Sequence, residues 1–176
     1  MTDWVIQVDP EDQPLGTVEK LAAHQQGILH RAVSVFLLDS QGRLLLQRRA
    51  TGKYHSGGLW SNTCCGHPGP GESVAQAARR RLREELGIEA ELSPLLRFQY
   101  RAELEGGLTE HELDHVFLGR FDGIPHPDPN EVSAWSWNSP SDLEAAMASS
   151  PAEYTVWLRL LLPAVRGCLR SEPNSP

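Results

Sequence analysis

A short pattern between residues 66 and 88 constrains this chain more than any other feature of its sequence. Ser73 and Gln76 have the spacing of a helix-capping box, and apolar residues follow at helical intervals as far as Leu86. A glycine then stands where helices commonly end. The fixed members of the pattern are Gly66, Glu72, Arg80, Glu84, Glu85 and Gly87, with aliphatic residues at positions 82 and 88. We therefore expect a loop, a helix over residues 73–86 and a second loop.

The polar residues of this helix suit a divalent cation that is bound to a diphosphate. Hard cations take oxygen ligands such as the carboxylates of Glu84 and Glu85, and two adjacent phosphates carry the charge that recruits them. Arg81 lies four residues before Glu85, so the two side chains share one helix face. A guanidinium group there can donate two hydrogen bonds to a phosphate. The helix is predicted to hold both a metal and a diphosphate.

Patterns typical of strands surround the helix and indicate an α+β fold or an α/β/α sandwich. A turn signal at residues 39–42 joins the first two expected strands into a hairpin. The polar, glycine-rich passage over residues 50–71 reads as a long functional loop. The expected strands cover residues 32–38, 44–47, 88–104, 108–121 and 132–137, and further helices cover 141–148 and 154–169, the last of them bent or broken at Pro163.

Length and composition fit one soluble catalytic domain. The 176 residues, 40% of them hydrophobic and 22% charged, are expected to form one domain over residues 1–170 with a disordered tail at 171–176. No apolar run approaches the roughly 18 residues of a membrane span, and the acidic start lacks the features of a secretory signal. Three cysteines form no disulfide framework, which favours a reducing, cytoplasmic compartment. No membrane partner is expected.

The net charge of −7 argues against a nucleic-acid partner, because a phosphate backbone attracts basic surfaces. The basic residues nevertheless gather in two clusters, at residues 48–53 and 79–83. Two local clusters on an acidic protein suit a small anionic ligand better than a polyanion, although any one of these residues could equally be a solvated surface charge.

The pattern around the helix resembles the Nudix box, a loop–helix–loop that binds a metal and a diphosphate. Hydrolytic members of that superfamily carry a glutamate directly after the box arginine, where this chain has Arg81. Replacing a carboxylate by a guanidinium removes a metal ligand and adds a phosphate donor. The departure favours diphosphate binding over diphosphate cleavage, on a Nudix-type α/β/α sandwich with mixed or antiparallel sheets.

A second resemblance, over residues 15–120, is to the type I isopentenyl-diphosphate isomerases. The segment 59–68, Leu-Trp-Ser-Asn-Thr-Cys-Cys-Gly-His-Pro, resembles the motif of that family closely. The similarity continues in order through the segments 19–24, 29–32, 47–50 and 110–112. It implies an isomerase that interconverts isopentenyl and dimethylallyl diphosphate by adding a proton at one carbon and removing one at another, through a tertiary carbocation.

The resemblance also implies a role for individual residues. Cys65 and Glu112 match the catalytic pair on opposite faces of the substrate, and Tyr100 matches an assisting tyrosine. Glu85 matches the ligand of a Mg²⁺ that arrives with the diphosphate. Trp157 aligns with an active-site tryptophan, whose indole could stabilise a cation by about 2 kcal/mol when desolvated. The implied ligands of a further divalent metal (Mn²⁺, Zn²⁺ or Mg²⁺) are His24, His30, His67, Glu110 and Glu112, and the implied phosphate-binding residues are Lys20, Arg49, Lys53 and Arg81.

The residues themselves agree with a metal site. Glu110 and Glu112 are two apart on an expected strand, so both can reach one ion. Three histidines and two carboxylates exceed a tetrahedral zinc site and suggest five or six ligands. The segment 54–58 departs from the family, where many members have a bulky aromatic residue and a proline before Gly58. His55, His111, His115 and His126 lack neighbouring ligands in the sequence and are assigned structural roles.

Two other functions remain open at this point: a Nudix hydrolase of a nucleoside or prenyl-type diphosphate, and a catalytically silent Nudix-like binding module. Hydrolysis needs neither Cys65 nor Glu112, and a decayed site should have lost some of the matched positions, none of which is missing. The isomerase is therefore favoured, with a small isoprenoid diphosphate as substrate. The sequence does not decide between a monomer and a homodimer.

Overall fold

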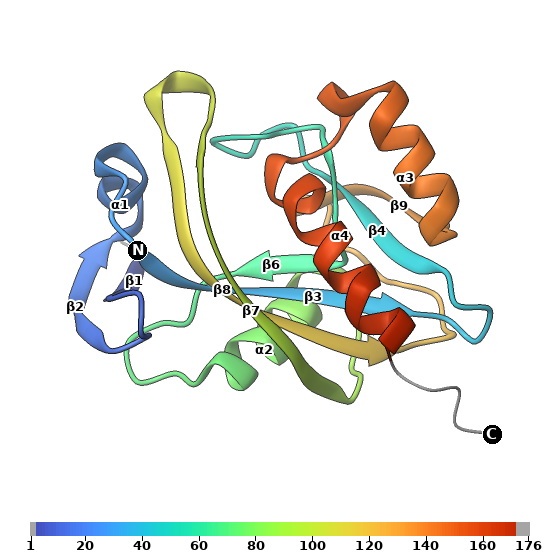
Figure 1. Ribbon diagram of the computed structural model, residues 1–176, viewed down its shortest axis with the longest axis horizontal. Coiled ribbons are helices and arrows are strands. Elements are labelled where there is room, and N and C mark those ends of the chain that lie inside the picture. Colours follow the sequence, from blue (N-terminus) through green and yellow to red (C-terminus); the bar gives the residue numbers. More distant parts are fainter. Residues whose placement is uncertain (1–2, 172–176) are drawn as a thin grey trace.

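The layers of the fold follow from alternation along β3 (His30–Leu38), a strand that is buried on both of its faces. Val33, Val35 and Leu37 pack against one helix, α2 (Val74–Leu86), in one apolar cluster. Phe36 and Leu38 point the opposite way and pack against α4 (Val156–Ser171) in a second cluster. The computed structural model describes residues 3–171, and in them the sheet lies between α2 on one side and α3 and α4 on the other (Figure 1).

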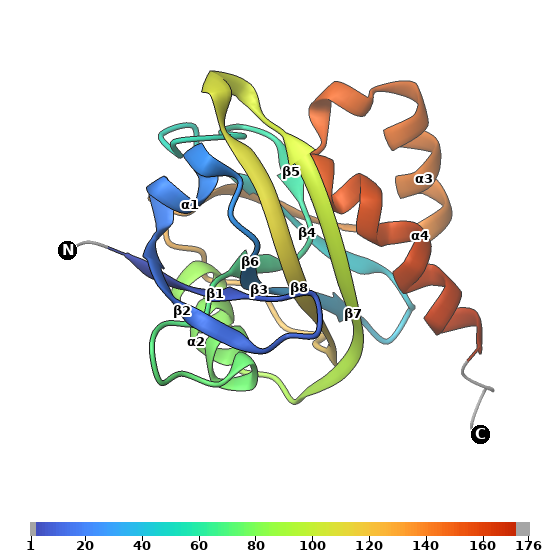
Figure 2. The same cartoon turned by 60° about the vertical axis from the view of Figure 1, so that its left-hand side comes forward.

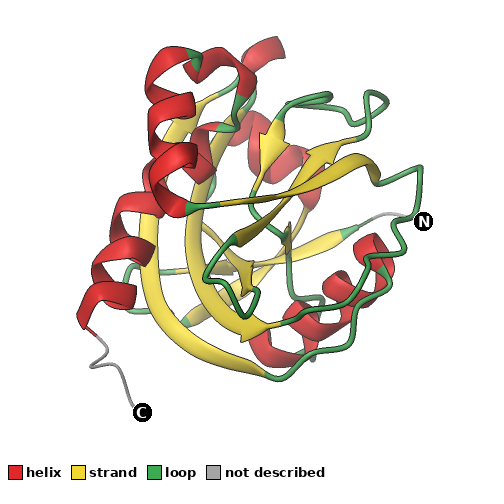
Figure 3. Cartoon of the chain, turned by 90° about the vertical axis from the view of Figure 1, so that its right-hand side faces the viewer, coloured by secondary structure: helices red, strands yellow, loops and turns green. Residues whose placement is uncertain are grey.

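The remaining elements complete a mixed sheet that is strongly curved (Figures 2 and 3). The strands are β1 (Trp4–Val8), β2 (Pro14–Glu19), β4 (Leu44–Arg49), β5 (Trp60–Ser61), β6 (Cys64–Gly66), β7 (Leu92–Glu103), β8 (Thr109–Arg120) and β9 (Val132–Asn138). The other helices are α1 (Lys20–Gln26), α3 (Pro140–Ser149) and two short 3₁₀ turns, Glu105–Gly107 and Pro151–Glu153. Strands β3 and β8 pair in parallel, and the other pairs of strands are antiparallel. An α+β fold with a mixed sheet is confirmed.

Residues 62–63 separate two strands that begin as a hairpin. β3 and β4 pair at Leu38 and Leu44 and then diverge. The Thr63 hydroxyl accepts a hydrogen bond from Leu37 N at 2.9 Å and donates one to Leu45 O at 2.7 Å, and so joins the separated strands. The Asn62 side-chain amide donates to Val35 O and to Cys64 O. These side chains satisfy strand groups that would otherwise be buried without partners, and they lead the chain directly into β6.

Helix α2 begins and ends where the sequence predicts. Ser73 and Gln76 form the reciprocal capping box, and Gly87 ends the helix in the left-handed conformation at φ 63°. A side chain at position 87 would also meet His126 O, because a Cβ there would lie 2.8 Å from it. At the other end of the pattern, a Cβ on Gly66 would lie 2.6 Å from Cγ of Arg81. Both glycines therefore allow the helix to lie close against its neighbouring loops.

Several predicted boundaries differ from the structure. Pro163 lies inside α4, which runs from Val156 to Ser171, so a break at this proline is wrong. The strand expected from residue 88 begins at Leu92, because Ile88 is buried against α2. The long loop over residues 50–71 contains the short strands β5 and β6. The sequence patterns also gave no elements for residues 4–26. Of the predicted tail, Ser171 ends α4 and residues 172–176 lie outside the described residues.

The neighbouring leucines of α4 provide a matched test of its packing. Leu161 is fully buried, whereas Leu160 keeps 40% of its surface exposed. Replacing Leu161 by alanine is expected to lower the free energy of unfolding by about 2–5 kcal/mol, because it leaves a cavity in the core. Replacing Leu160 by alanine is expected to change it by less than about 0.5 kcal/mol. Urea denaturation followed by circular dichroism measures both, and equal effects would contradict the packing described here.

Candidate metal centre and substrate cavity

Strand register assembles the centre of the site. In β8, Glu112 lies opposite His30 of β3 on one side and opposite Tyr100 of β7 on the other. The Tyr100 hydroxyl donates a hydrogen bond to Oε2 of Glu112 at 2.7 Å. Burial raises the pKa of Tyr100 well above its ordinary value, so the phenol keeps the proton that it donates. Three neighbouring strands thus place two of the predicted catalytic residues and one predicted metal ligand in a row.

All five residues that the resemblance implies as metal ligands lie around this row. His24 comes from α1, and its Nε2 lies 3.6 Å from Oε2 of Glu110. His30 Nε2 lies 3.6 Å from Oε1 of Glu112, and His67 Nε2 lies 2.8 Å from the same oxygen. The Nε2 atoms of His30 and His67 are 3.2 Å apart. Residues from α1, β3, β8 and the loop after β6 therefore meet at one point.

The hydrogen bonds of the rings show that these residues fit a cation. Nδ1 of His24 bonds to Lys20 O at 2.7 Å, and Nδ1 of His30 bonds to Ile28 O at 2.8 Å. A carbonyl only accepts, so Nδ1 of each ring carries a proton and Nε2 is the nitrogen left to bind a metal. Burial lowers the pKa of His67 to about 3, so this ring is neutral at pH 7. Lone pairs that face carboxylate oxygens need a positive charge between them, as metal-ligating histidines do.

Glu110 and Glu112 also indicate a site that fits a cation. Glu110 is 3% exposed, and its Oε2, like Nε2 of His24, is buried without a hydrogen-bond partner among the described residues. Burial and then the charge of Glu112 raise the pKa of Glu110 well above its ordinary value. A divalent cation would remove both penalties. Within residues 3–171, the group His24, His30, His67 and Glu112 has its ligand atoms all within 4.8 Å of one another.

A cavity of about 600 Å³ opens beside this centre. Such a volume is typical of pockets for small ligands. The predicted site residues that line it are Lys20, Arg49, Lys53, Cys65, His67, Arg81, Glu85, Tyr100, Glu110, Glu112 and Trp157. His24 and His30 are fully buried behind it. The structure therefore brings together every residue that the sequence predicted for the site, while the role of each stays a prediction.

Cys65 reaches the cavity from β6. It lies opposite Ser34 of β3, and its Sγ donates to Oδ1 of Asn62 at 3.3 Å. Burial, and then the nearby charge of Glu85, raise the pKa of this thiol to about 12. The thiol is therefore protonated at neutral pH. Its neighbour Cys64 points into the core with α2, as adjacent residues of a strand must.

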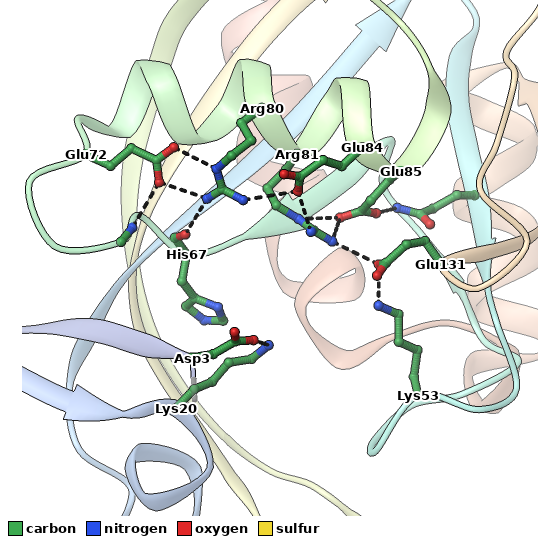
Figure 4. A network of polar contacts seen from close by, with 12 residues as sticks. Asp3, Lys20, Lys53, His67, Glu72, Arg80, Arg81, Glu84, Glu85 and Glu131 are labelled. Carbon is green, nitrogen blue, oxygen red and sulfur yellow. Dashed lines mark hydrogen bonds and ion pairs between the residues drawn. The ribbon is translucent and has the colours of Figure 1, made fainter. Parts of the chain in front are cut away.

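Basic residues at the α2 side of the cavity are already paired with carboxylates (Figure 4). Arg81 donates to Glu85 at 2.8 Å and to Glu131 at 2.9 Å, and Lys53 reaches the same Oε2 of Glu131 from the loop after β4. The other oxygen of Glu85 accepts from Gln47 at 2.5 Å. Oε2 of Glu85 accepts only this hydrogen bond among the described residues, so it keeps a second lone pair with which it could bind a Mg²⁺.

The other predicted phosphate ligands lie farther apart. Lys20 pairs with Asp3 at 3.6 Å, across the cavity from Arg81 in Figure 4. The guanidinium of Arg49 lies over the Trp157 ring at 5.2 Å and donates to His55 O at 3.3 Å. The indole nitrogen of Trp157 donates to the Ser61 hydroxyl at 2.9 Å. Trp157 thus already carries one cation on its ring.

Glu72 and Arg80, two members of the sequence pattern around α2, have a structural role. Glu72 accepts from Arg80 at 2.7 and 2.8 Å and from the backbone N of Gly69 at 3.0 Å. Arg80 also donates to His67 O at 3.2 Å. This pair fixes the loop that carries His67 onto the helix (Figure 4). Residues of the box therefore also position His67, a predicted metal ligand.

The sequence missed three residues of the site. His55, to which the sequence assigned a structural role, lies beside the metal centre, with its Nε2 3.5 Å from Oε1 of Glu110. Glu131 gave no signal, because its partners lie 50 and 78 residues away in the chain. Asp114, two residues after Glu112, follows the same strand face; burial and then the charge of Glu112 raise its pKa to about 8. The alternation that identified Glu110 and Glu112 could have found Asp114.

Comparison with known proteins agrees with this geometry. The NUDIX domain family matches residues 28–158. Isopentenyl-diphosphate Delta-isomerase 2 of Aromatoleum aromaticum is 52% identical over 96% of this chain and 89% of its own length. The isopentenyl-diphosphate Delta-isomerase of Burkholderia multivorans is 52% identical over 92% of each chain. This chain belongs to the type I isopentenyl-diphosphate Delta-isomerase family of the Nudix superfamily.

The Nudix fold is also visible in a solved structure. DR0079 from Deinococcus radiodurans superposes with a TM-score of 0.76 over 94% of this chain and 99% of that one, at 27% identity. The predicted Nudix-type fold is confirmed. A centre of histidines and glutamates beside the Nudix helix accounts for the expected divalent metal, although the geometry leaves the choice of ion open. None of the helices in residues 3–171 is long and apolar enough to cross a bilayer.

Substituting Glu110 by glutamine separates two effects of this residue. One is the stability that its buried charge costs, and the other is the metal affinity that its carboxylate provides. A carboxyl whose pKa is raised by folding binds more protons in the folded state, so its contribution to stability falls as pH rises above its unfolded value. The metal-free variant should therefore be more stable than the parent protein, and by more at pH 8 than at pH 6. Thermal melts in a chelator measure this difference.

Added Mn²⁺ should have the opposite effect on the two proteins. The parent should gain about 2.7 kcal/mol of stability at a metal concentration 100 times its dissociation constant. The Glu110→Gln variant should gain much less, because it has lost a ligand. The exposed Glu91→Gln variant serves as control and should follow the parent. An unaltered gain in Glu110→Gln would contradict metal binding by Glu110.

Proposed function

We propose that this chain interconverts isopentenyl diphosphate and dimethylallyl diphosphate. One observation carries the proposal: a thiol, a carboxylate with a tyrosine partner and basic residues face one cavity of about 600 Å³, and a group of histidines and glutamates that could hold a metal lies beside it. The names of the relatives, which are about 50% identical over most of the chain, support the same activity. Arg81, in place of a carboxylate, supports diphosphate binding without hydrolysis.

Cys65 and Glu112 would exchange one proton each with the substrate. A proton from one of them adds to the terminal alkene carbon, and the cation forms at the adjacent tertiary carbon. The other group removes a proton from the carbon on the far side, and the double bond forms there. The thiol holds a proton at neutral pH, whereas Glu112 accepts hydrogen bonds as a carboxylate. One proton is therefore available at the start, and one remains at the end.

The divalent ion held by the histidines and Glu110 would supply a positive charge that fixes Glu112. The chain itself orients that carboxylate through Tyr100 and His67. Lys53 and Arg81 would bind phosphate oxygens together with a Mg²⁺ at Glu85. Trp157 and the aromatic residues near it would face the hydrocarbon part of the substrate and exclude water from the cation.

A proton NMR time course in D₂O tests the activity. The protein with Mg²⁺ and isopentenyl diphosphate should produce dimethylallyl diphosphate that contains deuterium. Cys65→Ala and Glu112→Gln should reduce the rate by at least about 100-fold, the range in which general acid–base groups contribute. Cys168→Ala is the matched control and should keep full activity, because Cys168 lies near the end of α4, outside the cavity. Unchanged substrate with phosphate released from nucleoside diphosphates would instead indicate a hydrolase.

Glu131 offers a separate test of the diphosphate-binding side. Its carboxylate holds both Arg81 and Lys53, so an incoming diphosphate must compete with it for the same donors. Without metal, Glu131→Gln should bind inorganic diphosphate several-fold more tightly than the parent, as isothermal titration calorimetry would show. The exposed Glu91→Gln variant should bind like the parent. Weaker binding in Glu131→Gln would show that Glu131 supports the anion instead of competing with it.

A further inference from the structure

Glu110 faces a histidine with each of its two oxygens. Its Oε2 lies 3.6 Å from Nε2 of His24, and its Oε1 lies 3.5 Å from Nε2 of His55. His55 is 6% exposed and belongs to the loop between β4 and β5, which also carries Lys53. Together, His24, His55 and Glu110 form a second group whose ligand atoms all lie within 4.8 Å of one another. His55 is thus as close to Glu110 as the predicted ligand His24 is.

The spacing suits two ligands of one ion better than a hydrogen bond. A nitrogen–oxygen hydrogen bond measures about 2.7–3.2 Å. Two ligands that each lie about 2.1 Å from a metal are about 3.0–3.4 Å apart at ordinary bond angles. The separation between His55 and Glu110, 3.5 Å, falls just above the second range and matches the 3.6 Å found for His24 with Glu110 and for His30 with Glu112. The nitrogen–oxygen spacing is therefore nearly the same in all three pairs, close to that of two ligands on one ion.

The loop holds the His55 ring in place. Ser56 has a left-handed backbone at φ 51°, uncommon for a residue with a side chain, and its N–H donates to the Glu105 carboxylate. The carbonyl of His55 accepts from Arg49 at 3.3 Å. Strained backbone of this kind persists where the surroundings fix it, and it gathers at binding sites. The loop is thus built to present residue 55 in one position.

The second ring nitrogen of His55 allows the same tautomer as in the other ligands. Nδ1 of His55 lies 3.3 Å from the hydroxyl oxygen of Ser56, which can accept a hydrogen bond from it. In that arrangement Nε2 of His55 is left to face Glu110, as Nε2 of His24 faces Glu110 and Nε2 of His30 faces Glu112. A neutral imidazole is the form that binds metals.

We propose that His55 is a ligand of the divalent ion at the Glu110 end of the metal centre. With His24 and Glu110 it extends the ligand set beyond the residues that the family resemblance implies. The inference rests on the proposed metal centre, and it adds a nitrogen from a segment, residues 54–58, in which this chain departs from many family members. A fourth imidazole gives the centre a softer ligand set, which favours Zn²⁺ over Mg²⁺.

A packing role is the competing explanation, and two variants separate it from ligation. His55 meets the Tyr54 ring at 4.5 Å and the Trp157 ring at 5.8 Å, edge to face in both cases. His55→Phe keeps an aromatic ring for these contacts but has no nitrogen. His55→Gln keeps a polar side chain but has no imidazole. His126→Ala removes an exposed histidine and is the matched control. Melting of the metal-free proteins shows whether each variant folds.

Zn²⁺ affinity, measured by competition with a chromophoric chelator, gives the first readout. Both His55 variants should bind Zn²⁺ about 10- to 100-fold more weakly than the parent, the range seen when groups at a metal site are removed. His126→Ala should bind like the parent. In the Co²⁺-substituted proteins, the visible absorption bands should shift in the His55 variants alone. Parental affinity and bands in His55→Phe would overturn the proposal and leave a packing role.

Parent protein labelled with ¹⁵N-histidine gives a readout that needs no variant. On titration with Zn²⁺, the Nε2 resonances of four histidines (24, 30, 55 and 67) should move to the metal-bound position. Movement of only the other three would overturn the role of His55 and leave the metal centre intact. No movement of any of the four would overturn the metal centre as well. Neither result depends on isomerase activity, which the NMR time course in D₂O tests separately.

Discussion

The short segment that separates β3 from β4 determines where the whole site lies. Thr63 hydrogen-bonds to Leu37 of one strand and Leu45 of the other, so the sheet stays connected although its central strands part. Cys65 enters the cavity, and His67 reaches the metal centre, only because β6 follows this segment directly. Buried backbone groups need partners, and a side chain that cannot both donate and accept would leave these strands unsatisfied.

A second constraint is the negative charge buried beside β8. Glu110, Glu112 and Asp114 share one face of that strand, and burial together with mutual repulsion raises the pKa of Glu110 and of Asp114. Charges of one sign are costly in an interior unless something opposes them. The rings of His24 and His30 direct their Nδ1 protons at backbone carbonyls and away from these carboxylates. The cluster therefore costs stability in the metal-free protein, and ligand geometry and stability are linked at this point.

Some elements and site residues of this structure could be predicted from the sequence and others could not, for physical reasons. Local signals such as the capping box at Ser73 and the glycine at 87 located α2 to within a residue. The site residues were found through a family pattern, and the structure does bring them to one cavity. His55 and Glu131 were missed because their partners are far away in the chain. Pro163 misled because tertiary packing of α4, with Leu161 and Val165 fully buried, outweighs the local cost of a proline.

The paired state of the diphosphate-binding cations has a kinetic consequence. Arg81 and Lys53 are neutralised by Glu85 and Glu131 before any ligand arrives, and the chain as a whole carries a net charge of −7. An approaching anion therefore meets a net repulsion, which is largely screened at distances beyond about 8 Å at physiological salt. Capture of the proposed diphosphate substrate would therefore gain nothing from long-range steering, and added salt would speed the encounter instead of slowing it.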